Sequence, residues 1–297
     1  MDVNELLGRA QRLELKSRYL ARSQYAGLYS SAFRGLGMEF ADVRPYTEGD
    51  EIRLIDWNVS ARSQSLYVKR MVEERERNVL LVLDTSGSLS FGSVRRTKFD
   101  LLVELAALFI LSGFYAKDRV SLALVRSRVE TFIPAAKGWT HAARLLREIV
   151  VQQPEGGGDE MDQVWSFLNS PGVPRSLVLL LTDFLVPLLP MSAFAAACRK
   201  HEVVALLASD PREWDLPPLG RMQIRNPETG EHRVINTSEA ALRQEYRSRV
   251  QHRRQEMIKM LEGNRVDWVE FSTDADYEAP LRRFLESRIA RRGYRRP

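Results

Sequence analysis

The chain has 297 residues, of which 44% are hydrophobic and 28% charged, values typical of a globular protein with one or two domains. No apolar stretch approaches the roughly 20 residues that cross a bilayer, no secretory signal is visible, and the single cysteine, Cys198, excludes a disulfide framework. The net charge of +5 comes from residues 282–297, which alone carry +6, so we expect a soluble cytoplasmic protein without a membrane span or a basic body.

The N-terminal quarter changes character along its length. Residues 2–22 carry apolar side chains at helical spacing and predict an amphipathic helix. From Tyr25 to Tyr46, glycine, serine and aromatic residues break that spacing, which predicts short strands and turns, followed by a short helix over 56–62 and a strand over 66–70. We expect 1–77 to form an N-terminal helix and a β-rich extension packed on the core, because its pieces are too small for a core of their own.

Residues 78–90 carry the clearest chemical signal. The run 79–83 is wholly apolar and predicts a strand buried on both faces of a parallel sheet. Asp84, Ser86 and Ser88 follow it at a spacing of two, and ligands bind at the carboxyl ends of strands in open α/β sheets. One carboxylate and two hydroxyls suit a hard cation such as Mg²⁺ or Mn²⁺. A Ser/Gly turn that only caps a helix remains an equal alternative on these residues alone.

Beyond this loop, helical and strand patterns alternate. Helices are expected over 97–115, 139–151, 162–168, 193–200, 239–262 and 280–290, and strands over 119–125, 129–133, 177–181, 203–207 and 266–271. This order predicts an α/β fold with a mostly parallel sheet and helices on both faces. We place this domain at 78–290, with a β-hairpin insertion near 219–236 around Pro227-Glu228-Thr229-Gly230 and a basic tail at 291–297.

The arginine-rich C-terminal end allows two interpretations. It could bind nucleic acid or an anionic surface, or it could be a solvated helix end whose cations complement the helix dipole. Aromatic residues are not interleaved with the arginines, as they are in single-strand binding surfaces. The second interpretation is favoured, and no nucleic-acid partner is expected.

The oxygen-bearing residues form a recognisable set. Asp84, Ser86 and Ser88 end one apolar strand, Asp183 follows a second, and Thr140 stands in a Gly-x-Thr at a helix start. This set resembles the metal-ion-dependent adhesion site of von Willebrand factor A domains. The resemblance implies that these five residues hold a divalent cation, Mg²⁺ or Mn²⁺, directly or through water. It also implies an open coordination position for a carboxylate from a partner protein.

A second resemblance rests on motifs upstream and downstream of this set. These motifs are Gly37-Met38-Glu39-Phe40, Val43-Arg44-Pro45-Tyr46, Gly49-Asp50, Arg53, Ile55-Asp56-Trp57, Ala61-Arg62, Asp210-Pro211-Arg212-Glu213 and Pro227-Glu228-Thr229-Gly230. They resemble the bacterial domain-of-unknown-function family 58, from about Tyr25 to Arg288. The resemblance implies a von Willebrand factor A-like fold and a partnership with MoxR-type AAA+ ATPases. The upstream charged residues Arg44, Asp50, Arg53, Asp56 and Arg62 are expected to form ion pairs that hold the N-terminal segment on the main domain.

The favoured function is a metal-dependent adaptor that docks a partner's Glu or Asp, with a MoxR-type ATPase or its client as partner. Its rim is expected at the residues beside the ligand loops: Leu89, Phe91, Arg95, Trp139, Phe184 and Leu185. The alternative is a metal-dependent hydrolase or phosphatase that uses Asp84. That chemistry requires a second aspartate where Ser86 stands, and neither a Gly-x-Ser-x-Gly elbow nor a Walker lysine motif is present. No catalytic residue is therefore assigned.

Overall fold

The structure is a computed structural model that describes residues 3–33, 38–63, 65–73, 76–157, 162–184 and 191–293. The chain divides into two compact units, a main unit of residues 1–32 and 78–297 and a second unit of residues 33–77. The first boundary therefore lies near residue 33, because the N-terminal helices pack with the helices of the main unit rather than with the strands that follow them.

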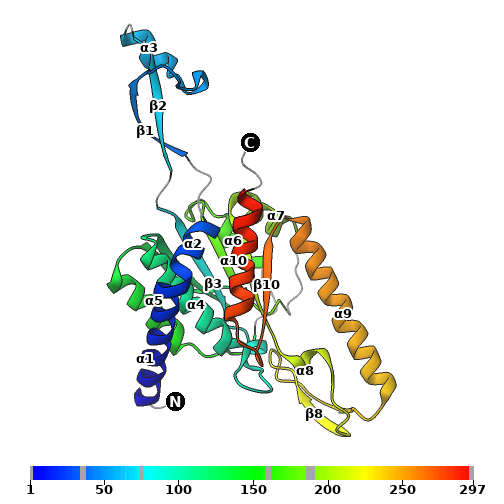
Figure 1. Ribbon diagram of the computed structural model, residues 1–297. Helices are drawn as coiled ribbons and strands as arrows, with labels where there is room; N and C mark the ends of the chain where they lie inside the picture. The colour runs from blue at the N-terminus through cyan, green and yellow to red at the C-terminus, as the bar shows by residue number, and fades with distance from the viewer. Residues whose placement is uncertain are drawn as a thin grey trace. The chain divides into compact units, whose positions relative to one another are not determined.

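The main unit is built on one six-stranded sheet, as the alternating pattern predicts (Figure 1). The strand order is β10-β7-β6-β3-β4-β5, and all neighbours are parallel except β5, which runs antiparallel to β4 at one edge. The strands are β3 (Asn78–Asp84), β4 (Arg119–Val125), β5 (Val129–Ala136), β6 (Leu177–Thr182), β7 (Glu202–Ser209) and β10 (Asp267–Ser272). The fold class α/β with a mostly parallel sheet is thus confirmed.

Helices cover both faces of this sheet, because the central strands are apolar on both sides. Successive residues of a strand point to opposite faces, and all of β6 is buried. Leu80 and Val82 face a core shared with α6, α7 and α9, whereas α4 covers the opposite face. The helices of the main unit are α1 (Val3–Leu20), α2 (Ala26–Ala32), α4 (Lys98–Tyr115), α5 (Trp139–Val151), α6 (Asp162–Asn169), α7 (Met191–Lys200), α8 (Pro211–Trp214), α9 (Ala240–Gly263) and α10 (Glu278–Gly293).

The segment from Tyr25 to Ala32 is helical, so the expected strands and turns are wrong there. A π-helical turn (Ala21–Tyr25) joins α1 to α2 without a break. Tyr25, Tyr29 and Phe33 are each 1% exposed and recur every four residues, which is helical spacing hidden among glycine and serine. Tyr25 donates to Glu278 O at 2.8 Å and Tyr29 to Asp118 Oδ2 at 3.0 Å, so the buried hydroxyls are satisfied.

The second unit is a two-stranded antiparallel sheet with short helices between its strands. It consists of β1 (Met38–Pro45), a 3-10 turn (Ile52–Leu54), α3 (Trp57–Ser63) and β2 (Tyr67–Glu73). Within this unit, Arg44 makes a bidentate ion pair with Asp50, with Nη1–Oδ2 and Nη2–Oδ1 distances of 2.7 and 2.6 Å. Asp56 caps α3 by accepting from the Asn58 and Val59 amides. Trp57 is 64% exposed.

The predicted insertion is also present. Strands β8 (Arg221–Arg225) and β9 (His232–Asn236) form a hairpin that pairs only with itself among the described strands. The hairpin lies near α8 at one end of the main unit (Figure 1). None of the described helices is both long and apolar enough to cross a membrane.

Candidate functional site

Asp84 is the last residue of β3 and is held in one orientation by two hydrogen bonds. Its Oδ1 accepts from the Ser86 amide at 2.8 Å, and its Oδ2 accepts from Thr182 Oγ1 at 2.6 Å. Thr182 ends the neighbouring parallel strand β6, so the two strand ends meet at the same edge of the sheet. Only 1% of Asp84 is exposed. With both oxygens engaged and no solvent access, Asp84 is poorly placed to act as a nucleophile.

Asp183 lies next to Thr182 and brings a second buried carboxylate to this edge. Burial first, and then the negative charge of Asp183, raises the pKa of Asp84 to about 6. The hydrogen bonds from Thr182 and Ser86 act in the opposite direction. The site therefore favours any positive charge that can approach Asp84.

Lys98 brings a positive charge to Asp183, and the sequence patterns did not reveal it. The residue is 0% exposed, and its Nζ lies 2.6 Å from Asp183 Oδ2 and also bonds Glu213 Oε1. Burial would lower the pKa of Lys98, but Asp183 and Glu213 together raise it, so the ammonium is the stable form. One buried cation thus links the start of α4 to the end of β6 and to α8.

The two serine hydroxyls of the loop lie together. Ser86 Oγ and Ser88 Oγ are 3.2 Å apart, and the two residues are 1% and 6% exposed. Neighbouring oxygens around an octahedral Mg²⁺ with bonds of about 2.1 Å stand roughly 3.0 Å apart. The spacing of the two hydroxyls therefore fits adjacent positions around such an ion. Asp84, Ser86, Ser88 and Asp183 are brought to one edge of the sheet, as expected.

Thr140 is not part of this cluster, so its assignment is wrong. The strand before it, β5, runs antiparallel, and Ala136 pairs with Val120 near the start of β4, whereas Asp84 pairs with Val125 at the other end. Five strand residues separate these positions, about 16 Å. Thr140 is exposed, and its neighbour His141 bonds Val120 O at 2.7 Å, at the amino edge of the parallel strands.

The expected rim is also largely wrong. Trp139 lies at the same far edge as Thr140, where its ring is 4.5 Å from the Arg18 guanidinium carbon. Leu89 is fully buried, and Phe184 is 5% exposed with a left-handed φ of 52°, which costs a non-glycine residue about 1–3 kcal/mol. Trp139 is 38% exposed at that far edge, whereas Phe91 and Arg95 are the exposed ones among the expected rim residues that follow the ligand loop, and Leu185 lies outside the described residues. Within the part of the chain that the structure describes, the cluster is therefore not ringed by exposed aromatic side chains.

The hairpin contributes a carboxylate of its own to the loop. Glu228, in the turn between β8 and β9, accepts from the Ser88 amide at 2.7 Å through Oε1. Within the described residues, no group of three or more His, Cys, Asp or Glu is arranged to hold a metal. Ligation at this edge would therefore depend on the serine hydroxyls as well as on carboxylates.

Local signals existed for two of the missed residues. Lys98 stands three and four positions before Leu101 and Leu102, which places it on the buried face of α4. Asp210-Pro211-Arg212-Glu213 is a capping box with proline at the first helical position, and it fixes Glu213 at the start of α8. Asp210 is itself fully buried and bonds both Ser93 and Thr273. No local pattern could have indicated that Glu228 reaches Ser88, 140 residues away in sequence.

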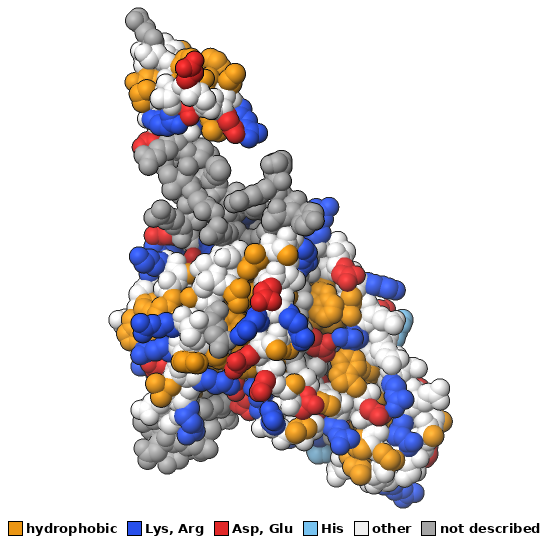
Figure 2. All heavy atoms as spheres, viewed as in Figure 1, with side chains coloured by type: hydrophobic (Ala, Val, Ile, Leu, Met, Phe, Trp, Pro, Cys, Tyr) orange, Lys and Arg blue, Asp and Glu red, His pale blue; other side chains and the backbone are white. Residues whose placement is uncertain are grey.

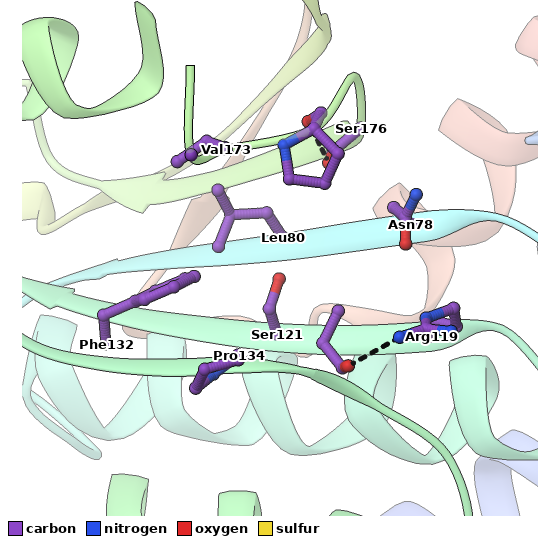
Figure 3. Close-up of a pocket in the computed structure, with 11 residues that line it drawn as sticks. Asn78, Leu80, Arg119, Ser121, Phe132, Pro134, Val173 and Ser176 are labelled. Carbon is purple, nitrogen blue, oxygen red and sulfur yellow. Dashed lines mark hydrogen bonds between the residues drawn. The ribbon is translucent and has the colours of Figure 1, made fainter. Parts of the chain in front are cut away.

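A pocket of about 420 Å³ lies elsewhere, at the amino ends of the strands (Figure 3). Asn78 and Arg119 stand at the starts of β3 and β4, and Leu80, Ser121 and Phe132 line it from three adjacent strands. Arg119 is its only charged lining residue and donates to Ala135 O at 3.3 Å. The pocket therefore offers no group of converging reactive side chains.

Part of the arginine-rich end is structural. Arg288, 3% exposed, pairs with Glu202 and Asp267, and Arg291 pairs with Asp267 at 2.9 Å. Helix α10 continues to Gly293, past the expected tail boundary at 291. On the face drawn in Figure 2, basic side chains of the main unit alternate with acidic and apolar ones. That face lacks the continuous positive surface typical of nucleic-acid binding.

Comparison with known proteins gives bacterial relatives, two of which align with nearly the whole of this chain. Two uncharacterized proteins, of Mycobacterium tuberculosis and Mycobacterium bovis, are each 30% identical over 295 residues, covering 99% of this chain and 92% of theirs. An uncharacterized protein of Mycobacterium avium is 29% identical over 165 residues, covering 55% of this chain and 96% of its own.

Among solved structures, a conserved hypothetical protein, BatB, from Bacteroides thetaiotaomicron aligns with a TM-score of 0.44 and 15% identity over 72% of this chain and 99% of its own. Residues 42–256 match the family profile described as protein of unknown function DUF58. The matched range includes the loop of Ser86 and Ser88 and the β8–β9 hairpin. With this match over most of its length, the chain belongs to the DUF58 family.

Proposed function

We propose that this protein is a binding module that holds a divalent cation, Mg²⁺ or Mn²⁺, with Asp84, Ser86 and Ser88 and uses it to dock a carboxylate. The observation that carries the proposal is the pair of hydroxyls 3.2 Å apart beside the Asp84 carboxylate. In this proposal the fold is von Willebrand factor A-like and the cluster is its adhesion site. Asp183, already paired with Lys98, contributes charge more than a direct bond.

The electrostatics of the cluster support a cation. Asp84 and Asp183 are both buried. The described ion pairs of Lys98 are with Asp183 and Glu213, so Lys98 offsets the charges of these two carboxylates rather than that of Asp84. A divalent ion at Ser86 and Ser88 would lie next to the remaining negative charge. When bound, it would supply a Lewis-acidic position that a carboxylate oxygen can occupy.

The partner we propose is a MoxR-type AAA+ ATPase or one of its clients. This choice rests on the resemblance of the motifs alone. It is tested by capture of a purified MoxR-type ATPase on the immobilised full chain in magnesium and again in EDTA. Equal capture under both conditions would place the contact on a surface that does not involve the ion.

The first prediction concerns metal binding. Free Mg²⁺ at 100 times its dissociation constant should stabilise the wild-type chain by about 2.7 kcal/mol relative to EDTA, because the ion binds the folded state only. The double variant Ser86→Ala/Ser88→Ala should lose this response. Thermal melting with EDTA and then with added magnesium measures both.

A matched control is Ser90→Ala. This hydroxyl, in the same turn, donates to Gly87 O at 2.6 Å and does not face Ser86. It should keep the magnesium response of the wild type. An equal response from the wild type and the Ser86/Ser88 double variant would remove the metal assignment.

A further inference from the structure

The tip of the β8–β9 hairpin rests on the loop that carries Ser86 and Ser88. Glu228 Oε1 lies 2.7 Å from the Ser88 amide nitrogen, although the two residues come from separate parts of the fold. The Glu228 side chain is only partly exposed, whereas most of the hairpin is open to solvent. The contact is therefore made by the turn, and not by the faces of the two strands.

Two glycines in the main unit allow this close approach. A Cβ at Gly156 would lie 2.6 Å from Pro227 O and 2.7 Å from Glu228 O, and a Cβ at Gly87 would also collide with Pro227 O. Side chains essentially never come so near to backbone atoms. Residues 87 and 156 are therefore compatible with the observed position of the tip only as glycine.

The tip is a closed turn, and its base is anchored. Asn226 Oδ1 accepts from the Glu228 amide at 2.9 Å, and Gly230 has a φ of 73° that closes the turn. At the other end, fully buried Thr237 bonds Gly220 O through both its amide, at 2.7 Å, and its hydroxyl, at 3.0 Å. The hairpin therefore holds the Glu228 carboxylate in position beside the Ser88 amide.

Glu228 brings a carboxylate to the loop that follows Asp84, which is itself 1% exposed. Carboxylate and hydroxyl oxygens are the ligands that Mg²⁺ and Mn²⁺ take in proteins. Asp84, Ser86, Ser88 and Glu228 would together offer two carboxylates and two hydroxyls to one divalent ion, whereas Lys98 is bonded to Asp183 and Glu213.

We propose that Glu228 is an intramolecular ligand of the cation held by Asp84, Ser86 and Ser88, and fills the position that a partner's carboxylate would take. This inference rests on the proposed function. It makes the free protein self-ligated, so that a partner must displace the hairpin tip before it can dock. It also accounts for the low exposure of Ser86 and Ser88, 1% and 6%, in a chain whose ligand site should be open.

The test uses the full chain and Mn²⁺ alone as the probe. Binding affinity and the water-proton relaxation rate per bound ion are measured for the wild type, Glu228→Ala and Glu228→Gln. Loss of the carboxylate should weaken Mn²⁺ binding about tenfold or more and raise the relaxation rate, because water replaces the missing ligand. Glu228→Gln keeps an acceptor for the Ser88 amide, so it separates loss of ligation from loss of the hairpin contact.

Glu231→Ala is the matched control. It removes the same charge from the same turn, but Glu231 pairs with Arg233 at 3.0 Å and does not contact the loop. Mn²⁺ binding and relaxation that are identical in the Glu228 variants and in Glu231→Ala would overturn the role of Glu228 and leave the proposed function standing. Absence of Mn²⁺ binding in every protein, wild type included, would overturn both.

Discussion

Lys98 shows how one buried residue joins three elements of the main unit. Its side chain is inaccessible to solvent and sits between the carboxylates of Asp183, in the loop after β6, and Glu213, in α8. An ion pair of this kind adds little stability compared with apolar residues of the same shape, but removing one partner leaves the other charges buried and unpaired. The group therefore fixes the relative position of the elements more than it strengthens the fold.

Replacing Lys98 with methionine should destabilise the protein by about 3–5 kcal/mol, because Asp183 and Glu213 lose their common partner. Urea unfolding in EDTA, followed by circular dichroism, measures the change without any contribution from metal. Lys16→Met is the control, since Lys16 pairs with Glu104 at the surface, at 2.8 Å with 47% of its side chain exposed. That substitution should cost no more than about 1 kcal/mol. Equal losses in the two variants would contradict the structural role of Lys98.

Among the elements of the main unit, the β8–β9 hairpin is held in place by contacts at its tip and at its base. Its strands add no partner to the main sheet, so the base at Thr237 and the tip at Ser88 hold it. Such an element can open locally at a lower free energy than the sheet, because it buries little apolar surface of its own. A steric change at the tip should therefore move the hairpin without unfolding the core.

Gly156→Ala should push the hairpin tip away from the ligand loop, because the new Cβ meets the backbone of Pro227 and Glu228. We expect faster hydrogen exchange of the Ser88 amide, by about tenfold or more, and a loss of stability of about 1–3 kcal/mol from overpacking. Exchange measured on peptides covering residues 84–90 reports the first effect. Gly172→Ala is the control, since its Cβ would meet nothing within 4 Å. Unchanged exchange in Gly156→Ala would show that the loop does not depend on the tip.

For the whole molecule, the two units raise the question of whether residues 33–77 are required for folding. Arg77 donates to Phe33 O, so the two ends of the second unit lie within reach of one side chain. Phe33 and Arg77, the first and last residues of the second unit, therefore lie close together. The packing of this β-rich segment on the core of the main unit stays a prediction.

Replacing residues 34–76 with a short Gly-Ser linker should leave the main unit folded, because the described core cluster around Leu80 and Val82 is made of main-unit residues. A melting temperature within about 4 °C of the full chain, equivalent to about 1 kcal/mol, is the expected result. Thermal unfolding of the shortened chain measures it, and a chain with a scrambled β1–β2 sequence of equal length serves as control. Loss of cooperative unfolding would show that the second unit stabilises the first.

The sequence by itself determined the order of the sheet strands and of the longer helices from residue 78 onward, and the cluster at the end of β3. Strands buried on both faces must be apolar throughout, as in 79–83 and 177–181. Such uninterrupted apolar runs can be recognised in the sequence without any knowledge of the tertiary structure. The placement of Asp84, Ser86, Ser88 and Asp183 at one edge followed from the parallel direction of β3 and β6. Tyr25 to Phe33 was misread because glycine and serine masked an aromatic repeat of four residues.

Only the tertiary structure decided which other residues share that edge. The antiparallel direction of β5 carried Thr140 and Trp139 to the opposite edge, and no local pattern encodes strand direction. Lys98 meets Glu213 across 115 residues and Ser88 meets Glu228 across 140, so these contacts depend on how distant segments pack. The spacing of apolar residues along the sequence indicates which side of a helix or strand is buried. The partner of a buried charged residue depends instead on which distant segment packs against it.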